Sequence, residues 1–240
     1  AAKDHYKQNS DLQQFTYIVS HNLRSPVANA IGLSNMLTQI DKGSSLFDLT
    51  LSNLNQSLSR LDTVLRDINT ILSIRDSKGN FEMEQVGIKS VIQQALHSLQ
   101  EPLEKCGGKV INEVEESLVV RANKAYLYSV FYNLLSNAIK YRSEERSLIV
   151  RIGSNYDAAR GIVISISDNG LGFDMKKASG NLFKLYKRFH TDRQGRGIGL
   201  YLVKTHLETM DGNVEVSSQE GVGTKFSIFL PKSKNEDIHR

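Results

Sequence analysis

Seven aliphatic residues in the first third of the chain recur at alternating spacings of three and four. They are Leu51, Leu54, Leu58, Leu61, Leu65, Ile68 and Leu72. This spacing is the a/d pattern of helices that pack in a coiled coil or bundle. A similar apolar stripe runs through residues 12–40, and turn-forming residues 41–45 separate the two segments. The pattern therefore predicts an antiparallel helical hairpin.

Two helices alone cannot bury both leucine-rich stripes of such a hairpin. We therefore expect it to pair with a second copy as a dimeric four-helix bundle, so that the chain is a homodimer. The helical pattern also reaches almost to residue 1 without a convincing cap. From this we expect a sensor domain upstream.

The hydrophobic pattern changes after a short linker at residues 77–80. Amphipathic helices and apolar strands interleave from residue 81 to about residue 231, and a tail follows at 232–240. The expected helices span 88–103, 123–141 and 198–210, and the expected strands span 110–114, 118–120, 148–152, 162–166, 214–216 and 226–230. This alternation predicts an α/β two-layer sandwich that follows the all-α hairpin of residues 1–76 in the sequence.

Composition excludes several other classes of protein. The 240 residues are 40% hydrophobic and 23% charged, which argues against a disordered chain. The net charge of +4 is too mild for a nucleic-acid binder, and no apolar run approaches the ~18 residues of a membrane span. The lone cysteine, Cys106, cannot pair within the chain, so we expect a reducing, cytoplasmic compartment. We expect this fragment itself to make no membrane contact, and a larger, membrane-associated sensor of which it is the soluble part is compatible with this expectation.

Two asparagines on the expected helix 123–141 carry the first chemical signal. Asn133 and Asn137 are four residues apart and share a helix face, with Lys140 and Tyr141 close by. A carboxamide oxygen suits Mg²⁺ held beside phosphates, and Lys140 can approach an anion. Taken alone, the pair is more often simply two asparagines on a helix surface.

Asp168 follows the alternating strand 162–166 directly and opens the run Asp168-Asn-Gly-Leu-Gly. A carboxylate at a strand end can accept the exocyclic amine of adenine, and Gly170 and Gly172 let the backbone approach a ligand. A plain turn is the alternative interpretation.

A second glycine cluster opens the helix expected at 198–210. Gly195, Gly197 and Gly199 precede Leu200, and glycines at a helix N-terminus expose N–H groups to phosphate. Residues 170–206 hold eight Lys or Arg against two acids, a balance that attracts a triphosphate. A fourth motif ends in Thr224, before the last strand. The joint occurrence of these motifs favours a nucleotide site.

The ordered set over residues 81–231 resembles the ATP-binding domain of sensor histidine kinases, within the Bergerat-type (GHKL) ATPases that include Hsp90, gyrase B and MutL. The resemblance implies ATP and Mg²⁺, with Asn137 on the metal and Asp168 on adenine. Residues 182–189 are similar to the family's aromatic lid motif. The implied nucleotide-binding residues are Asn133, Asn137, Lys140, Tyr141, Asp168, Gly170, Gly172, Phe183, Arg188, Gly195, Gly197, Gly199, Leu200 and Thr224.

Residues 15–26 resemble the family's H-box, which makes His21 the implied phosphoacceptor, with Asn22 and Arg24 as catalytic neighbours. An exposed imidazole has a pKa near ~6.5 and is largely neutral at pH 7. The family usually carries an acid where this chain has Asn22. An amide can hydrogen-bond the ring but cannot take up a proton.

These features predict ATP-dependent autophosphorylation on His21 and transfer to an aspartate of a response-regulator receiver domain, in two-component signalling. Two alternatives remain open. Asn22 favours a catalytically weak ATP-binding scaffold, whereas the shared nucleotide site also fits a GHKL-type ATP hydrolase, which the H-box opposes.

Overall fold

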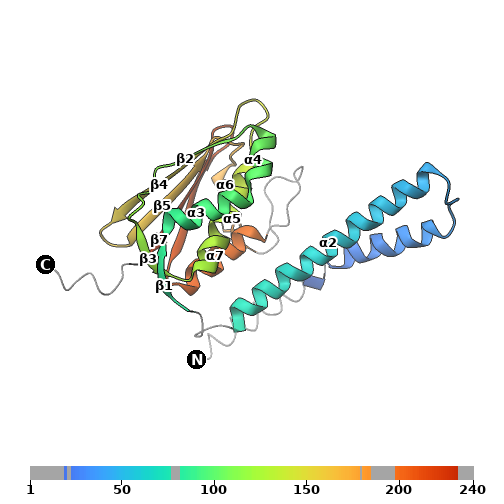
Figure 1. Cartoon of the computed structure of the whole chain (residues 1–240), viewed down its shortest axis with the longest axis horizontal. Helices are drawn as coiled ribbons and strands as arrows, with labels where there is room; N and C mark the ends of the chain where they lie inside the picture. The colour runs from blue at the N-terminus through green and yellow to red at the C-terminus, as the bar shows by residue number, and fades with distance from the viewer. Residues whose placement is uncertain (1–18, 21–22, 77–81, 179, 185–197, 232–240) are drawn as a thin grey trace. The chain divides into compact units, whose positions relative to one another are not determined.

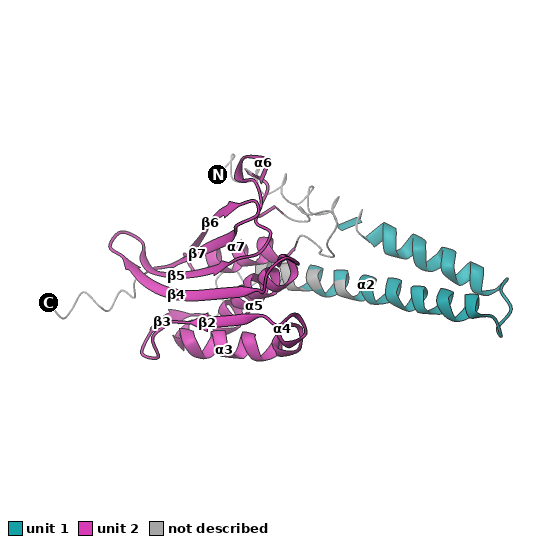
Figure 2. Cartoon of the chain, turned by 90° about the horizontal axis from the view of Figure 1, so that it is seen from above, with its two compact units in different colours: residues 1–76 teal, residues 77–240 magenta. Residues whose placement is uncertain are grey.

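The computed structural model describes residues 19–20, 23–76, 82–178, 180–184 and 198–231. The chain divides into two compact units, residues 1–76 and residues 77–240 (Figure 2). None of the helices in the described ranges is long and apolar enough to cross a membrane.

The part of the first unit that the structure describes from residue 23 onward contains two helices joined by a tight turn. Residues 23–37 are helical, and the second helix, α2, spans Ser45–Asp76. Asp41 shapes the turn, because its Oδ1 accepts a hydrogen bond from the Gly43 amide at 3.1 Å. The Ser44 hydroxyl accepts one from the Phe47 amide at 3.3 Å at the start of α2. The two helices lie side by side and antiparallel (Figures 1 and 2).

Only part of the predicted leucine seam is covered inside this hairpin. The least exposed positions of α2 that are described are Phe47, Thr50, Leu54, Ser57, Leu61, Val64 and Ile68, again at alternating spacings of three and four. The exposed positions of the predicted seam are Leu51, Leu58, Leu65 and Leu72, which are 40%, 47%, 46% and 41% exposed. The covered face is thus shifted by about one residue from the leucine seam, because Thr50 and Ser57 occupy places that a search for leucines passes over.

The second unit is built on a five-stranded mixed sheet. Its strands are β2 (Lys109–Asn112), β4 (Ile149–Asp157), β5 (Gly161–Asp168), β7 (Gly223–Leu230) and β6 (Asn213–Gln219), in that spatial order. The pair β2–β4 is parallel and the other three pairs are antiparallel. A separate antiparallel pair joins β1 (Glu84–Gly87) to β3 (Val119–Ala122). The predicted mixed α/β sandwich is confirmed.

Three helices pack side by side over one face of this sheet (Figure 1). They are α3 (Ile88–Ser98), α5 (Lys124–Lys140) and α7 (Gly199–Thr209). Their apolar faces and the inward side chains of the strands form one core, in which Ile88, Phe131 and Leu207 are completely covered. The core holds the C-terminal end of α5 and the C-terminal end of β5 in place, and both ends carry predicted site residues.

The helix predicted at 88–103 is in fact two helices, which corrects the sequence-based boundary. α3 ends at Ser98, Leu99 leaves helical geometry with φ −107° and ψ 10°, and α4 spans Gln100–Cys106. Pro102 explains the break, since a proline inside a continuous helix lacks the N–H that bonds the carbonyl four residues earlier. In the first turn of α4 the missing N–H would have no helical partner anyway.

Two short elements were not predicted, namely β1 and the single-turn helix α6 (Met175–Ala178). β1 has only one apolar side chain, Val86, so it shows no alternation to detect. The helix α6 is too short for a helical period.

Candidate functional site

The predicted amide pair lies on α5, facing the start of α7. The Nδ2 group of Asn133 donates to the carbonyl oxygen of Ser129 at 2.8 Å, which directs the Oδ1 atom away from its own helix. A Cβ atom on Gly199 would lie 2.7 Å from that Oδ1. Any side chain at position 199 would therefore occupy the space beside the amide. The structure brings Asn133 and Gly199 together, although they are far apart in sequence.

Asn137 lies one helical turn after Asn133 and is half-buried. Its carbonyl oxygen accepts the Tyr141 amide at 2.9 Å, which closes the last turn of α5. The Lys140 ammonium lies 4.6 Å from the centre of the Tyr141 ring. The C-terminal turn of α5 thus holds an amide, a cation and an aromatic ring in one place.

Asp168 is the last residue of β5 and is half-buried. Its Oδ1 accepts a hydrogen bond from the Gly170 amide at 2.8 Å, and its backbone pairs in register with Thr224 on β7. Burial raises the pKa of the Asp168 carboxyl, while the Gly170 and Thr224 amides and the charge of Arg146 act in the opposite direction. Asp168 is therefore a carboxylate placed where water is scarce, the setting in which a hydrogen bond to a ligand is strongest.

The turn after Asp168 packs against the end of α5. The Leu171 amide donates to the Tyr141 carbonyl at 2.8 Å, and a Cβ atom on Gly170 would lie 2.6 Å from the same oxygen. Glycine is required at position 170 because a side chain would push the turn off the helix.

The same turn touches the β6–β7 connection on its other side. Gly172 has a φ of +61°, and a Cβ atom there would lie 1.9 Å from the Gln219 carbonyl oxygen. The Ser218 hydroxyl accepts the Phe173 amide at 2.9 Å and lies 2.9 Å from the Thr224 hydroxyl. The end of β5, the turn after it and the start of β7 thus bring together Asp168, Gly170, Gly172 and Thr224.

The remaining predicted residues fall into two groups. Phe183 and Leu200 are half-buried against the core, and Arg24 is exposed on the helix of residues 23–37. The others lie outside the described residues, and these are His21, Asn22, Arg188, Gly195 and Gly197.

Sequence reasoning missed Arg146 at this site. Its guanidinium bonds the carbonyl oxygens of Asn169, Gly170 and Gly221 at 2.6 to 2.8 Å. In the sequence it follows two glutamates in a loop, a pattern typical of a solvated surface. No local signal distinguishes it from a solvent-facing arginine.

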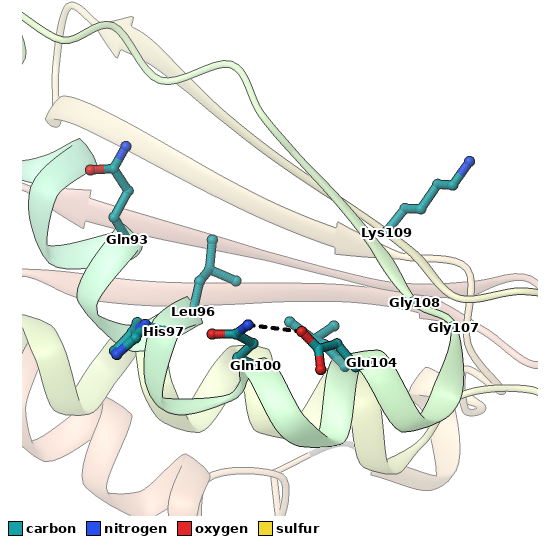
Figure 3. Close-up of a pocket in the computed structure, with 9 residues that line it drawn as sticks. Gln93, Leu96, His97, Gln100, Glu104, Gly107, Gly108 and Lys109 are labelled. Atoms are coloured by element: carbon teal, nitrogen blue, oxygen red, sulfur yellow. Dashed lines mark hydrogen bonds between the residues drawn. The ribbon is translucent and has the colours of Figure 1, made fainter.

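A separate groove lies beside α3, α4 and the start of β2 and contains none of the predicted residues. His97, Gln100 and Lys109 are among the residues that line it, and the Gln100 amide donates to the Glu104 carboxylate at 2.8 Å (Figure 3). It has no connection with the chemistry predicted from the motifs.

Comparison with known proteins agrees with this geometry. Residues 122–234 match the family of histidine kinase-, DNA gyrase B- and HSP90-like ATPases. Sensor protein RprX of Bacteroides fragilis is 26% identical over 91% of this chain and 43% of its own length. Cyanobacterial phytochrome A of Nostoc is 29% identical over 100% of this chain and 31% of its own length. The chain thus spans less than half the length of these curated relatives.

Solved structures share the fold at low sequence identity. Histidine kinase ThkA, in complex with response regulator protein TrrA, is similar over 98% of this chain and 66% of the solved chain, with a TM-score of 0.72 and 21% identity. The Acinetobacter baumannii histidine kinase AdeS covers 88% of this chain and 97% of its own, with a TM-score of 0.67 and 20% identity. The family match and the curated relatives, together with this shared fold, confirm the expected resemblance to the catalytic core of sensor histidine kinases.

Proposed function

Because this chain contains the catalytic core of a sensor histidine kinase, we propose that it transfers the γ-phosphoryl group of ATP to His21 and then to an aspartate of a receiver domain. One observation carries the proposal. Three features of the second unit are neighbours, namely the amides of α5, the carboxylate of β5 and the start of α7. Each of them is predicted to contact a different part of ATP.

Each end of the nucleotide has a suitable partner in this arrangement. The carboxylate of Asp168, at the end of its strand, is placed to accept a hydrogen bond from the exocyclic amine of adenine. The first N–H groups of α7 suit phosphate, since the side chain of the N-cap residue Ile198 makes no capping hydrogen bond. Lys140 supplies a cation on the neighbouring helix turn.

Magnesium fits the amides of α5. The Asn133 Oδ1 atom faces the space that the absent side chain of Gly199 leaves open, and Asn137 follows one turn later. We assign Asn137 as the protein ligand because the family resemblance implies it, and its carboxamide oxygen is a hard donor that suits Mg²⁺. Bound there, the metal would neutralise charge on the phosphates, which is the main requirement of phosphoryl transfer.

The reaction itself needs little covalent chemistry from the protein. A neutral ring nitrogen of His21 attacks the γ-phosphorus in line, the N–P bond forms, and the bond from phosphorus to the bridging oxygen breaks, so ADP leaves. The phosphorylated ring is then cationic, and it loses the N–H proton of its other nitrogen to water. Asn22 can orient the ring without taking that proton, and positioning supplies most of the rate enhancement.

We also propose that the hairpin of residues 1–76 is the dimerisation and phosphotransfer domain. Leu51, Leu58, Leu65 and Leu72 are seven residues apart and leave a stripe of 40% to 47% exposed leucine along α2. Four-helix bundles bury such stripes between helices, so a second copy is its natural partner. Residues 77–80 would link this domain to the ATP-binding domain, 81–231.

A response-regulator receiver domain is the proposed acceptor, because phosphohistidine can pass its phosphoryl group to a carboxylate. The solved complex of ThkA with TrrA supports this choice of partner class. The cytoplasmic location expected from Cys106 stays a prediction.

Incubation with γ-labelled ATP and Mg²⁺ separates this function from its two alternatives. We expect an acid-labile, base-stable label on the protein that is lost in His21→Gln. Nucleotide binding without label would instead favour a scaffold, the alternative that Asn22 suggests. Steady release of phosphate without protein label would favour a GHKL-type hydrolase.

A further inference from the structure

Arg146 lies between two turns of the candidate nucleotide site. It is half-buried in the connection from α5 to β4. Its Nε donates to the Asn169 carbonyl at 2.6 Å, and its Nη2 donates to the carbonyls of Gly170 and Gly221 at 2.7 and 2.8 Å. One planar cation thus bonds the turn after Asp168 and the β6–β7 turn at the same time.

The two turns approach closely, and their carbonyl oxygens converge on the Arg146 guanidinium. A Cβ atom on Gly223 would lie 2.0 Å from the Asp168 carbonyl oxygen, and one on Gly172 would lie 1.9 Å from that of Gln219. Converging carbonyl dipoles repel one another unless a donor lies among them. The fork of an arginine offers several N–H donors in one plane, which a lysine cannot reproduce.

The turn that Arg146 holds also sets the position of the Asp168 carboxylate. Asp168 Oδ1 accepts the Gly170 amide at 2.8 Å, and the carbonyl of the same Gly170 accepts Arg146. A shift of this turn therefore moves the carboxylate. The charge of Arg146 also opposes the rise in the pKa of Asp168 that burial causes.

We infer that Arg146 is a positioning residue for base selection, which holds the Asp168 carboxylate where it accepts the amine of adenine. The inference rests on the proposed function, since it assumes that the site binds ATP. Arg146 acts through the backbone of residues 169–170 and not by touching the nucleotide. Guanine has a carbonyl in place of that amine, so the carboxylate favours adenine.

The test measures the preference for ADP over GDP, by displacement of a fluorescently labelled ADP from the whole chain in the presence of Mg²⁺. Arg146→Lys keeps the charge but loses the fork, and Arg146→Gln keeps donors but loses the charge. We expect each to lower the ADP-to-GDP preference about tenfold or more, the effect of a weakened hydrogen bond to a charged group. One folded variant is enough for the comparison.

Arg160→Lys is the matched control. Arg160 pairs with Asp157 and Glu215 and stacks on Phe229 at the opposite end of β5, so its replacement leaves the preference unchanged. An unchanged preference in the Arg146 variants, even with a lowered melting temperature, would overturn the inference and leave a purely structural role. A wild-type chain that binds no ADP would instead overturn the proposed function, and the inference with it.

Discussion

His206 is a buried histidine on α7 with an unusual environment. Its side chain is 3% exposed, and neither ring nitrogen has a hydrogen-bond partner among the described residues. The ring of Tyr126 packs edge-on against it at 4.5 Å between centroids. Burial lowers the pKa of His206 to about 4, so the folded chain keeps the neutral ring where an unfolded chain binds a proton.

This difference predicts acid sensitivity. Between about pH 6.5 and pH 4 the unfolded state binds a proton that the folded state excludes, so stability falls by about 1.4 kcal/mol per pH unit as the pH is lowered. His206→Leu should remove this contribution. Calorimetry at pH 7 and pH 5 should show a smaller loss of melting temperature for His206→Leu than for the wild type. An equal loss in both would mean that His206 is not the group responsible.

Single residues also show where prediction from sequence stops. Asn133, Asp168 and Gly199 could be chosen because their residue types stand out in a helix, at a strand end and before a helix. Arg146 could not, because its hydrogen-bond partners in the described part of the chain are all backbone carbonyls, which any sequence supplies. The burial of His206 also depends on the packing of α7 on α5, and nothing about a histidine in the sequence indicates that packing.

At the scale of elements, the stripe on α2 makes a prediction about assembly. Leu58 and Leu65 are 47% and 46% exposed, and burial of a leucine side chain contributes about 1.5–3 kcal/mol. Replacing both with aspartate would place charges in the proposed bundle. We expect the wild type to be a dimer and Leu58→Asp/Leu65→Asp to be a monomer by analytical ultracentrifugation, with helicity retained.

Leu49→Asp is the control for this experiment. Leu49 is 58% exposed but lies on a different side of α2, so its replacement should leave the dimer intact. A double variant that remains dimeric, or a monomeric wild type, would contradict the proposed interface.

Elements with a clear period were predicted and short ones were not. β5 alternates as Ile162, Ile164 and Ile166 and could be recognised because one face is apolar. β1 and α6 contain too few residues for a period. The break between α3 and α4 was not predicted, because the hydrophobic pattern continues across it and contains no information on the backbone effect of Pro102.

At the scale of the molecule, the candidate site depends on the order of the strands. Asp168 meets Thr224 only because β5 and β7 are neighbours, although β6 and α7 come between them in sequence. Local patterns do not determine that order. The resemblance to a known family could nevertheless indicate which residues share a site, because the family's fold fixes how its motifs are arranged in space.

The central claim is that nucleotide binds between the C-terminal half of α5 and the turn after β5. Asn137→Ala tests it most directly, since it removes the proposed magnesium ligand from a half-buried position and leaves the hairpin untouched. Asn155→Ala, at an exposed asparagine of β4, is the matched control. With γ-labelled ATP and Mg²⁺, we predict that Asn155→Ala is phosphorylated like the wild type and that Asn137→Ala, still dimeric, takes up no label. Normal labelling of Asn137→Ala would contradict the assignment of the nucleotide site.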